Sequence, residues 1–503
     1  MTSILLRNGY VVTVDPDRRV FPNGYVRVDG ERIAAIGPMD RLARAVADEV
    51  DEVLDVGGKL VIPGLINLHD HHWASLFKGF DEGEEMEPWL VSHVIPLSLA
   101  LTPRDLRIAA YISSLEMLRY GVTCSVNHLA NINDADSFAA MASAGQEVGV
   151  RQILAKEVRG TPDPPFSADY PAYPHIRSLD EELALAEEIV RRWHGKDGVV
   201  HVGLATETGA FYMLNNSTST ETIHRSLTLA DKYDLRISNH MGSGSPSRTI
   251  PQFADVTGGG EIDYLQRLQA LSPRWLFVHD QWLDDRELDL IAETGGSMAI
   301  CTSSGAFRVV GIAPLRKMLA RGINVGLGTD GAWSAGSLDV VQQMRITALV
   351  HNALNADPTL VTAERAIEMA TVNAAAAVGL VGEIGSLEVG KRADITVFDV
   401  THPPVNGWHR PVSSLVFSAT GADAHTVLVN GQVVLRDCRP GFTNEADVLT
   451  EARAIARTLL EKTNLTDYPD TPWRTPKPVS ASPRRARCCH RDETPRGRWS
   501  ELG

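Results

Sequence analysis

Histidine and aspartate side chains that can bind a metal ion stand at the ends of several apolar runs. The first run, LVIPGLINLH, ends at His69, and His71 follows two residues later. Residues two apart in a strand face the same side, so these two imidazoles can bind one metal ion together. Later runs end in Asn239-His240, His279-Asp280 and Thr329-Asp330. Three imidazoles and one carboxylate would satisfy a divalent ion and leave one position open for water.

The elements that must position these side chains alternate between strands and helices. From about residue 60 to residue 380, eight short apolar runs are separated by amphipathic helical stretches. Such alternation predicts a parallel sheet, and eight parallel strands close a (β/α)8 barrel. We therefore predict an α/β fold with a (β/α)8 TIM-like barrel. In that fold the metal-binding side chains gather at the C-terminal ends of the strands.

The two ends of the chain resemble each other and differ from the middle. Residues 1–57 and 385–437 hold short alternating runs broken by turn residues, and Asn430-Gly431 is a strong hairpin signal. We predict that both termini build one small composite β-sandwich domain. The expected organisation is a first part of this β domain (1–58), the metal-dependent barrel (59–380), a second part of the β domain (381–440), and a C-terminal helix with a disordered Pro/Arg-rich tail (441–503).

Composition and charge restrict the function classes. The chain has 48 basic and 63 acidic residues, a net charge of −15. This balance disfavours binding to nucleic acid or to an anionic membrane. No apolar stretch reaches the ~18 residues that span a bilayer, and the five cysteines do not form a disulfide framework. We expect a cytoplasmic protein with a small-molecule substrate and no nucleic-acid or membrane partner.

Several motifs together resemble the amidohydrolase superfamily, in particular its cytosine deaminase and chlorohydrolase-like branch. They are PGLINLHDHHWASLFKGF, RYGVTCSVNH, INVGLGTDGAWS and AIEMATVNAAAAVGLVGEIGSLEVGKRADITVFD. The resemblance covers about residues 1–440 and implies one catalytic divalent metal ion per chain, zinc or else iron, in a dimer or larger homo-oligomer. It implies His69, His71, His240 and Asp330 as the metal ligands. It also implies that His279 contacts the hydrolytic water or the substrate.

The sequence departs from this family pattern at residues that handle protons and substrate. The branch has a proton-shuttling Glu three residues after the fifth-strand His, where this chain has Ser243. The fourth strand of the family commonly ends in Pro-His, where this chain has Thr206-Glu207-Thr208. We expect Glu207 either to shuttle the proton or to bind substrate. Ser243 and Trp73 are further candidates for the substrate pocket, although core packing explains Trp73 equally well.

The leading hypothesis is a metal-dependent hydrolase of a C–N bond, not a peptide bond, in a small molecule, with deaminase-like chemistry. Asp330 would take a proton from the metal-activated water, and His279 would polarise the substrate or orient the water. One alternative keeps the metal centre for another leaving group, or for elimination or cyclisation. Another alternative is a non-catalytic assembly module. Lys156 is a candidate for the carbamylated lysine of a two-metal site, or else a surface or pocket lysine.

Overall fold

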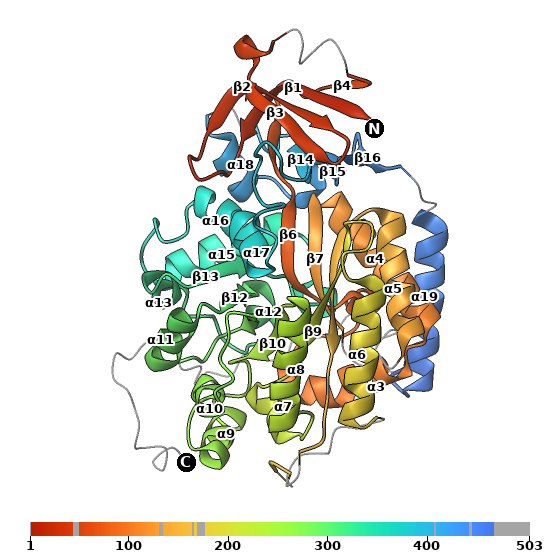
Figure 1. The fold of residues 1–503 in the computed structure, drawn as a ribbon, viewed down its shortest axis with the longest axis vertical. Coiled ribbons are helices and arrows are strands. Elements are labelled where there is room, and N and C mark those ends of the chain that lie inside the picture. The colour runs from red at the N-terminus through yellow and green to blue at the C-terminus, as the bar shows by residue number, and fades with distance from the viewer. Residues whose placement is uncertain are drawn as a thin grey trace, which may run out of the picture. The chain divides into compact units, whose positions relative to one another are not determined.

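The computed structural model describes residues 2–43, 50–129, 134–162, 165–167, 177–406, 409–441 and 445–466. The tail predicted to be disordered lies outside these residues. Two sheets organise the described part, one of eight strands and one of nine. Figure 1 shows the eight-stranded sheet surrounded by helices, and the second sheet built from red and blue strands, the two ends of the chain. Within the described residues, no helix has the length and apolar character needed to cross a membrane.

The eight-stranded sheet is the predicted barrel. Its strands are β6 (Leu65–Asp70), β7 (Val122–Leu129), β8 (Arg151–Glu157), β9 (Val200–Ala205), β10 (Ile237–Met241), β11 (Trp275–His279), β12 (Ser297–Ile300) and β13 (Asn324–Leu327). Consecutive strands pair in parallel from β6 to β13. The ends of the sheet meet where the backbone N–H groups of Thr329 and Asp330 donate to the carbonyl of His69, at 3.2 and 3.0 Å. The prediction of a (β/α)8 barrel is confirmed.

Helices connect successive barrel strands, as the alternation predicted. Those that lead from one strand back to the next are α4 (Pro103–Arg119), α5 (Ala135–Val148), α6 (Leu179–Trp193), α8 (Thr220–Tyr233), α10 (Glu261–Arg267), α11 (Asp285–Thr294) and α13 (Leu315–Ala320). After β13 come α15 (Val340–Leu354), α16 (Ala363–Ala370) and α17 (Val372–Ala377). The sequence sets where α4 begins, because Thr102 and Asp105 form a capping box and Pro103 occupies the first turn.

Short helices fill the segments that extend from the C-terminal ends of the strands. They are η2 (His72–Phe77), α2 (Met86–Trp89), η3 (Leu90–Val94) and α3 (Ile95–Ala100) after β6, α7 (Ala210–Leu214) after β9, α9 (Thr249–Thr257) after β10, α12 (Thr302–Phe307) after β12, and α14 (Ala332–Ala335) after β13. These segments supply most of the side chains that line a pocket at this end of the barrel.

The nine-stranded sheet combines strands from both ends of the chain. From the N-terminal end come β1 (Ser3–Val12), β2 (Val20–Asp29), β3 (Arg32–Pro38), β4 (Glu52–Asp55) and β5 (Leu60–Pro63), and from the other end β14 (Ile395–Phe398), β15 (Ala424–Val429), β16 (Gln432–Arg436) and β17 (Arg439–Pro440). The two halves join where β5 pairs antiparallel with β14. Asn430 and Gly431 connect β15 to β16 with positive φ angles of 51° and 78°, as a two-residue hairpin turn requires.

The run LVIPGLINLH is not one strand, as its apolar character had indicated. It divides at Gly64, with β5 in the composite sheet and β6 in the barrel. A side chain at Gly64 would collide with Thr123 of β7, so only glycine lets the chain pass from one sheet to the other here. The N-terminal part of the composite sheet therefore reaches Pro63, past the predicted limit at residue 58. The other predicted domain limits stay predictions.

A buried ion pair joins the barrel to the composite sheet. Arg151 of β8 donates to Asp394, which precedes β14, from Nε to Oδ2 at 3.0 Å and from Nη2 to Oδ1 at 2.9 Å. Both side chains are almost fully buried. The backbone N–H of Asn430 also donates to Asp394 Oδ1, at 2.8 Å. The two-point geometry and the extra donor are what make burial of these charges tolerable.

Replacement of Asp394 by Ala is expected to lower the free energy of unfolding by about 3–5 kcal/mol, because it leaves the Arg151 guanidinium buried without its counter-charge. The control is Asp289→Ala, which removes a partly exposed partner of Arg321 and should cost no more than about 1 kcal/mol. Denaturant unfolding of the full chain measures both. Equal effects of the two substitutions would contradict a structural role for the buried pair.

Candidate active site

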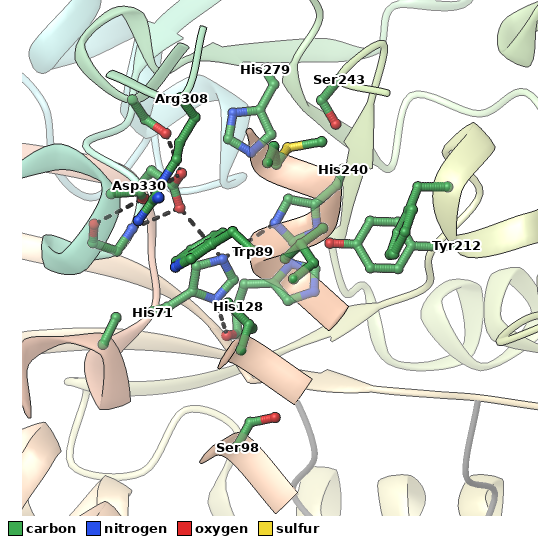
Figure 2. A pocket seen from close by; sticks show the side chains of 18 of the residues that line it. His71, Trp89, Ser98, His128, Tyr212, His240, Ser243, His279, Arg308 and Asp330 are labelled. Atoms are coloured by element: carbon green, nitrogen blue, oxygen red, sulfur yellow. Dashed lines mark hydrogen bonds and ion pairs between the residues drawn. The ribbon is translucent and has the colours of Figure 1, made fainter. Parts of the chain in front are cut away.

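The metal-binding side chains predicted from the sequence lie together at the C-terminal ends of the barrel strands. His69 belongs to β6 and His71 comes just after it, His240 belongs to β10, His279 ends β11, and Asp330 comes after β13. The ligand atoms of His69, His240 and His279 lie within 4.8 Å of one another, and so do those of His69, His71 and Asp330. Figure 2 shows His71, His240, His279 and Asp330 grouped on one side of the pocket.

Unusual backbone angles turn some of these side chains toward the centre. The φ angles of His279 and Asp330 are 81° and 66°, a region that residues other than glycine seldom adopt. Hydrogen bonds hold the turn at the end of β13: the N–H of Thr329 donates to Asn67 Oδ1 at 2.9 Å, and Asn67 Nδ2 donates to Thr329 Oγ1 at 2.8 Å. Strain of this kind is typical of functional sites, where surrounding contacts maintain it.

Hydrogen bonds fix the tautomers of two imidazoles. His71 Nδ1 donates to the carbonyl of His128 at 2.9 Å, and His240 Nδ1 donates to Glu207 Oε1 at 2.5 Å. In each ring Nε2 is therefore the nitrogen left to bind a ligand. These two Nε2 atoms lie only 3.3 Å apart, and His71 Nε2 lies 3.5 Å from Asp330 Oδ1. Rings oriented in this way present their free nitrogens to one common point.

The protonation states of the clustered side chains favour binding of a cation. Burial lowers the pKa of His69 well below its usual range and that of His71 to about 3, so both rings are neutral. Burial alone would raise the pKa of Asp330, but His69 and the other nearby imidazoles lower it well below its usual range. Both ring nitrogens of His69 are buried and have no hydrogen-bond partner among the described residues. Neutral imidazoles, an ionised carboxylate and buried unpaired nitrogens fit a divalent ion.

Asp330 is held by donors on its far side. Its Oδ2 accepts hydrogen bonds from the hydroxyls of Ser304 and Ser334, and its Oδ1 accepts one from the N–H of Gly331 at 2.7 Å. Oδ1 also faces His69 Nε2 at 3.6 Å. Ser304 belongs to α12, so the segment after the seventh strand helps to fix the orientation of this carboxylate.

Glu207 binds histidines through both carboxylate oxygens. Besides His240 Nδ1, its Oε1 lies 2.9 Å from His128 Nε2, and its Oε2 accepts the backbone N–H of His240 at 3.1 Å. Burial would raise the pKa of Glu207, but the adjacent His240 and His128 lower it well below its usual range. Burial alone would lower the pKa of His240, but the adjacent Glu207 raises it above its usual value. The carboxylate is thus ionised and placed to orient His240.

A pocket with aromatic walls opens beside the cluster. Its lining includes Trp73, Glu207, Ser243 and His279, the candidate substrate-binding residues named from the sequence. Trp73 is also buried against Phe77 and Trp333, so it packs in the core and borders the pocket at once. The roles of these four residues toward a substrate stay predictions.

Several pocket residues were not identified from the sequence. They are Trp89, His128, Glu157, Arg159, Phe211, Tyr212, Arg308 and Trp333. His128 had a usable signal, because it ends the run GVTCSVNH just as His240 ends its own run. The others stand at a strand end or in loops and short helices, where no periodicity marks a side chain as facing the pocket. Arg308 illustrates this, since it pairs with Asp81 at 3.1 Å and lies 3.9 Å from the centre of the Trp89 ring.

Lys156 does not join the cluster. Its Nζ donates to Glu182 of α6 at 2.9 Å, and both side chains are largely buried. A lysine paired in this way is held by its counter-ion and is not directed at the imidazoles. Lys156 is therefore not placed to bridge two metal ions among these imidazoles.

Comparisons with known proteins agree with the fold and with a hydrolase activity. Residues 60–434 match the Amidohydrolase family. The chain is 32% identical over 459 residues to a 5-methylthioadenosine/S-adenosylhomocysteine deaminase of Syntrophobacter fumaroxidans, covering 91% of this chain and 98% of that protein. It is 31% identical over 458 residues to a 5'-deoxyadenosine deaminase of Methanothermobacter thermautotrophicus, covering 91% and 99%.

Solved structures share the architecture. An adenosine deaminase from Xanthomonas campestris with bound zinc has a TM-score of 0.81 at 24% identity, covering 92% of this chain and 99% of that one. An atrazine chlorohydrolase from Arthrobacter aurescens complexed with zinc has a TM-score of 0.80 at 23% identity, covering 90% and 100%. At such low identity these two likenesses show the fold alone.

The family model spans most of the chain, and the curated relatives align along nearly their whole length. The predicted activity, metal-dependent hydrolysis of a non-peptide C–N bond in a small molecule, is confirmed at this level. The chain belongs to the amidohydrolase family.

Proposed function

We propose that the protein is a zinc-dependent deaminase of nucleosides that carry a 6-aminopurine base. The observation that carries this proposal is the convergence of His69, His71, His240, His279 and Asp330 beside a pocket with aromatic walls. Flat heterocycles pack well between aromatic rings. The relatives that align along their whole length are named for adenosine-type substrates, which supports the choice of base. A cytoplasmic location and a homo-oligomeric state stay part of the proposal.

Four residues would hold the ion, namely His69, His71, His240 and Asp330, with one ion per chain. Zinc suits a site of imidazoles and one carboxylate, and iron is the alternative. A divalent ion bound there lowers the pKa of a coordinated water toward 7. His279 completes the cluster from the side of β11, where it would orient the water or the substrate. Burial lowers the pKa of His279 to about 4, so the ring is neutral and can accept or donate one hydrogen bond.

Asp330 would hold the proton that moves during the reaction. Its carboxylate accepts one proton as the water oxygen forms a bond to C6 of the base, and it returns that proton to the leaving amine. The C6–N bond then breaks and ammonia departs, so one water is consumed for each ammonia released. The hydroxyls of Ser304 and Ser334 stabilise the ionised carboxylate between these transfers.

Glu207 would act as a positioning residue rather than as the proton shuttle. Both of its oxygens already bind histidine nitrogens, and it contacts the ring nitrogen of His240 that points away from the metal position. A carboxylate in that place sets the tautomer and the orientation of a metal-binding imidazole. This geometry argues against the shuttle role that the sequence left open.

A second candidate function is hydrolysis of another leaving group, such as chloride, on a similar heterocycle. Ser243 favours it, because a leaving group that departs as an anion does not need the acid that a glutamate would supply at this position. The pocket of aromatic side chains would accept either type of substrate.

Incubation of the zinc-loaded protein with adenosine, 5'-deoxyadenosine, 5-methylthioadenosine and a chlorinated triazine separates the two functions. Nucleoside deamination should release one ammonia per turnover and replace the adenine absorbance by that of a 6-oxopurine. Chloride release from the triazine without ammonia release from any nucleoside would favour the second function. The metal-free protein is the control and should be inactive toward every compound.

The substitutions His240→Ala and Asp330→Asn should each abolish turnover and lower the bound zinc well below one ion per chain, because each removes a ligand. The helical circular dichroism of both variants should match that of the parent protein. Elemental analysis after gel filtration gives the stoichiometry. Full activity in either variant, or two metal ions per chain in the parent, would contradict the assignment.

The substitution Glu207→Gln should weaken zinc binding by about 10–100-fold, since it removes the charge that orients His240. Competition with a chromogenic chelator measures this change. With saturating zinc, the pH dependence of kcat/KM should keep the same number of ionisations as in the parent. Loss of one ionisation with unchanged zinc affinity would instead identify Glu207 as the proton shuttle.

A further inference from the structure

The pocket holds carboxylates, but each one is already engaged. Asp330 accepts from two serine hydroxyls, Glu207 binds two histidines, and Glu157 lies 2.5 Å from the Arg159 guanidinium. Ser243 stands where the family resemblance places a glutamate. A donor of a different type is therefore needed for the negative charge that develops on the base when water adds to it.

Tyr212 has the position and the chemistry for this task. It lies on α7, directly after β9, and borders the pocket together with His240. Its ring stacks on the His240 imidazole with centroids 5.5 Å apart and planes 24° apart. Figure 2 shows its hydroxyl directed at the histidines. That hydroxyl has no hydrogen-bond partner among the described residues, and phenols are protonated at neutral pH.

The surroundings of Tyr212 hold the phenol in this direction. The neighbouring residues Ala210, Met213 and Leu214 of α7 are buried in one cluster with Phe253. The backbone N–H of Ala210 donates to the buried Glu261, at 2.5 Å. The helix thus presents Tyr212 to the pocket while its other face is anchored. A donor that is oriented before the substrate arrives needs little reorganisation during the reaction.

We propose that Tyr212 is a catalytic residue whose hydroxyl donates a hydrogen bond to the ring nitrogen next to the reacting carbon. This inference rests on the proposed deamination. Addition of water to C6 forms the C–O bond and moves the electron pair of the C6–N1 double bond onto N1, where Tyr212 Oη would stabilise it. No proton leaves Tyr212. The electron pair then returns from N1 and restores the C6–N1 double bond, as ammonia departs with the proton delivered by Asp330.

Tyr212 is preferred to Ser243 as the donor because its hydroxyl is directed at the histidines and the anchored helix α7 holds it in that direction. Both side chains border the pocket, so position alone does not separate them. Their two variants therefore belong in the same experiment.

The test compares Tyr212→Phe with Ser243→Ala and with the control Tyr264→Phe. The control removes a hydroxyl that lies 3.2 Å from Thr220 Oγ1, outside the residues that line the pocket. With the zinc-loaded chain and a nucleoside that the parent deaminates, Tyr212→Phe should lower kcat about 100-fold, as loss of one such donor does, with KM changed less than about 3-fold. The control should stay within about 2-fold of the parent.

A binding measurement tests the same inference without turnover. Purine riboside lacks the amino group and can take up water at C6, so its hydrated form resembles the reacting state, whereas inosine is the product. By calorimetry, Tyr212→Phe should weaken purine riboside binding by about 10–100-fold and inosine binding by less than about 3-fold. Zinc content and melting temperature should match the parent.

Each of the other possible results contradicts either the role of Tyr212 or the proposed deamination. If Tyr212→Phe weakens the binding of purine riboside and inosine equally, Tyr212 is a binding residue and not a catalytic one. If it weakens neither, Tyr212 has no part in the mechanism. Selective loss in Ser243→Ala alone assigns the donor to Ser243 instead. A parent protein that deaminates none of the nucleosides refutes the proposed function, and the inference falls with it. A parent protein that deaminates them while Tyr212→Phe does so equally well refutes the inference alone.

Discussion

Two imidazole nitrogens that face each other define the centre of this protein. His71 and His240 each commit Nδ1 to an acceptor, so both direct Nε2 toward one point, where these two atoms lie 3.3 Å apart. His69 adds buried nitrogens without partners among the described residues. Polar groups gathered in a buried space are costly without a partner, and a cation bound among these nitrogens and the Asp330 carboxylate would supply one. The site is therefore built for a cation, and its other features serve to keep these rings in place.

The barrel strands set the positions of the clustered imidazoles and of Asp330, and the hydrogen-bond partners behind these side chains set their orientation. Strand ends alone would leave each side chain free to rotate. Glu207 and the carbonyl of His128 fix two rings, and two serine hydroxyls fix Asp330. Loss of an outer partner of this kind typically lowers the affinity of a metal site by about 10–100-fold. The departure from the family motif at the fourth strand thus adds a support to the centre, and Ser304 after the seventh strand adds another.

Periodicity and the chemistry of strand ends made most of the architecture predictable from the sequence. Eight apolar runs, turn signals at both termini, and His or Asp residues just after the runs sufficed to predict the barrel, the composite sheet and the clustering of these side chains. The sequence did not show that LVIPGLINLH divides at Gly64, because the collision with Thr123 involves a residue from another strand. It could not show that Glu207 binds His240 or that Tyr212 stacks on it, because both contacts depend on how the segment after β9 folds against the end of β10.

The composite sheet has a consequence for the order in which the protein can be made. Its two halves meet at the pairing of β5 with β14, and the whole barrel lies between these strands along the chain. A ribosome adds about 5–20 residues per second, so β5 leaves the exit tunnel long before its partner exists. Until then its edge offers unpaired N–H and C=O groups to any other nascent strand. Completion of this sheet therefore comes late in synthesis, and β5 can mispair with other strands until β14 has been made.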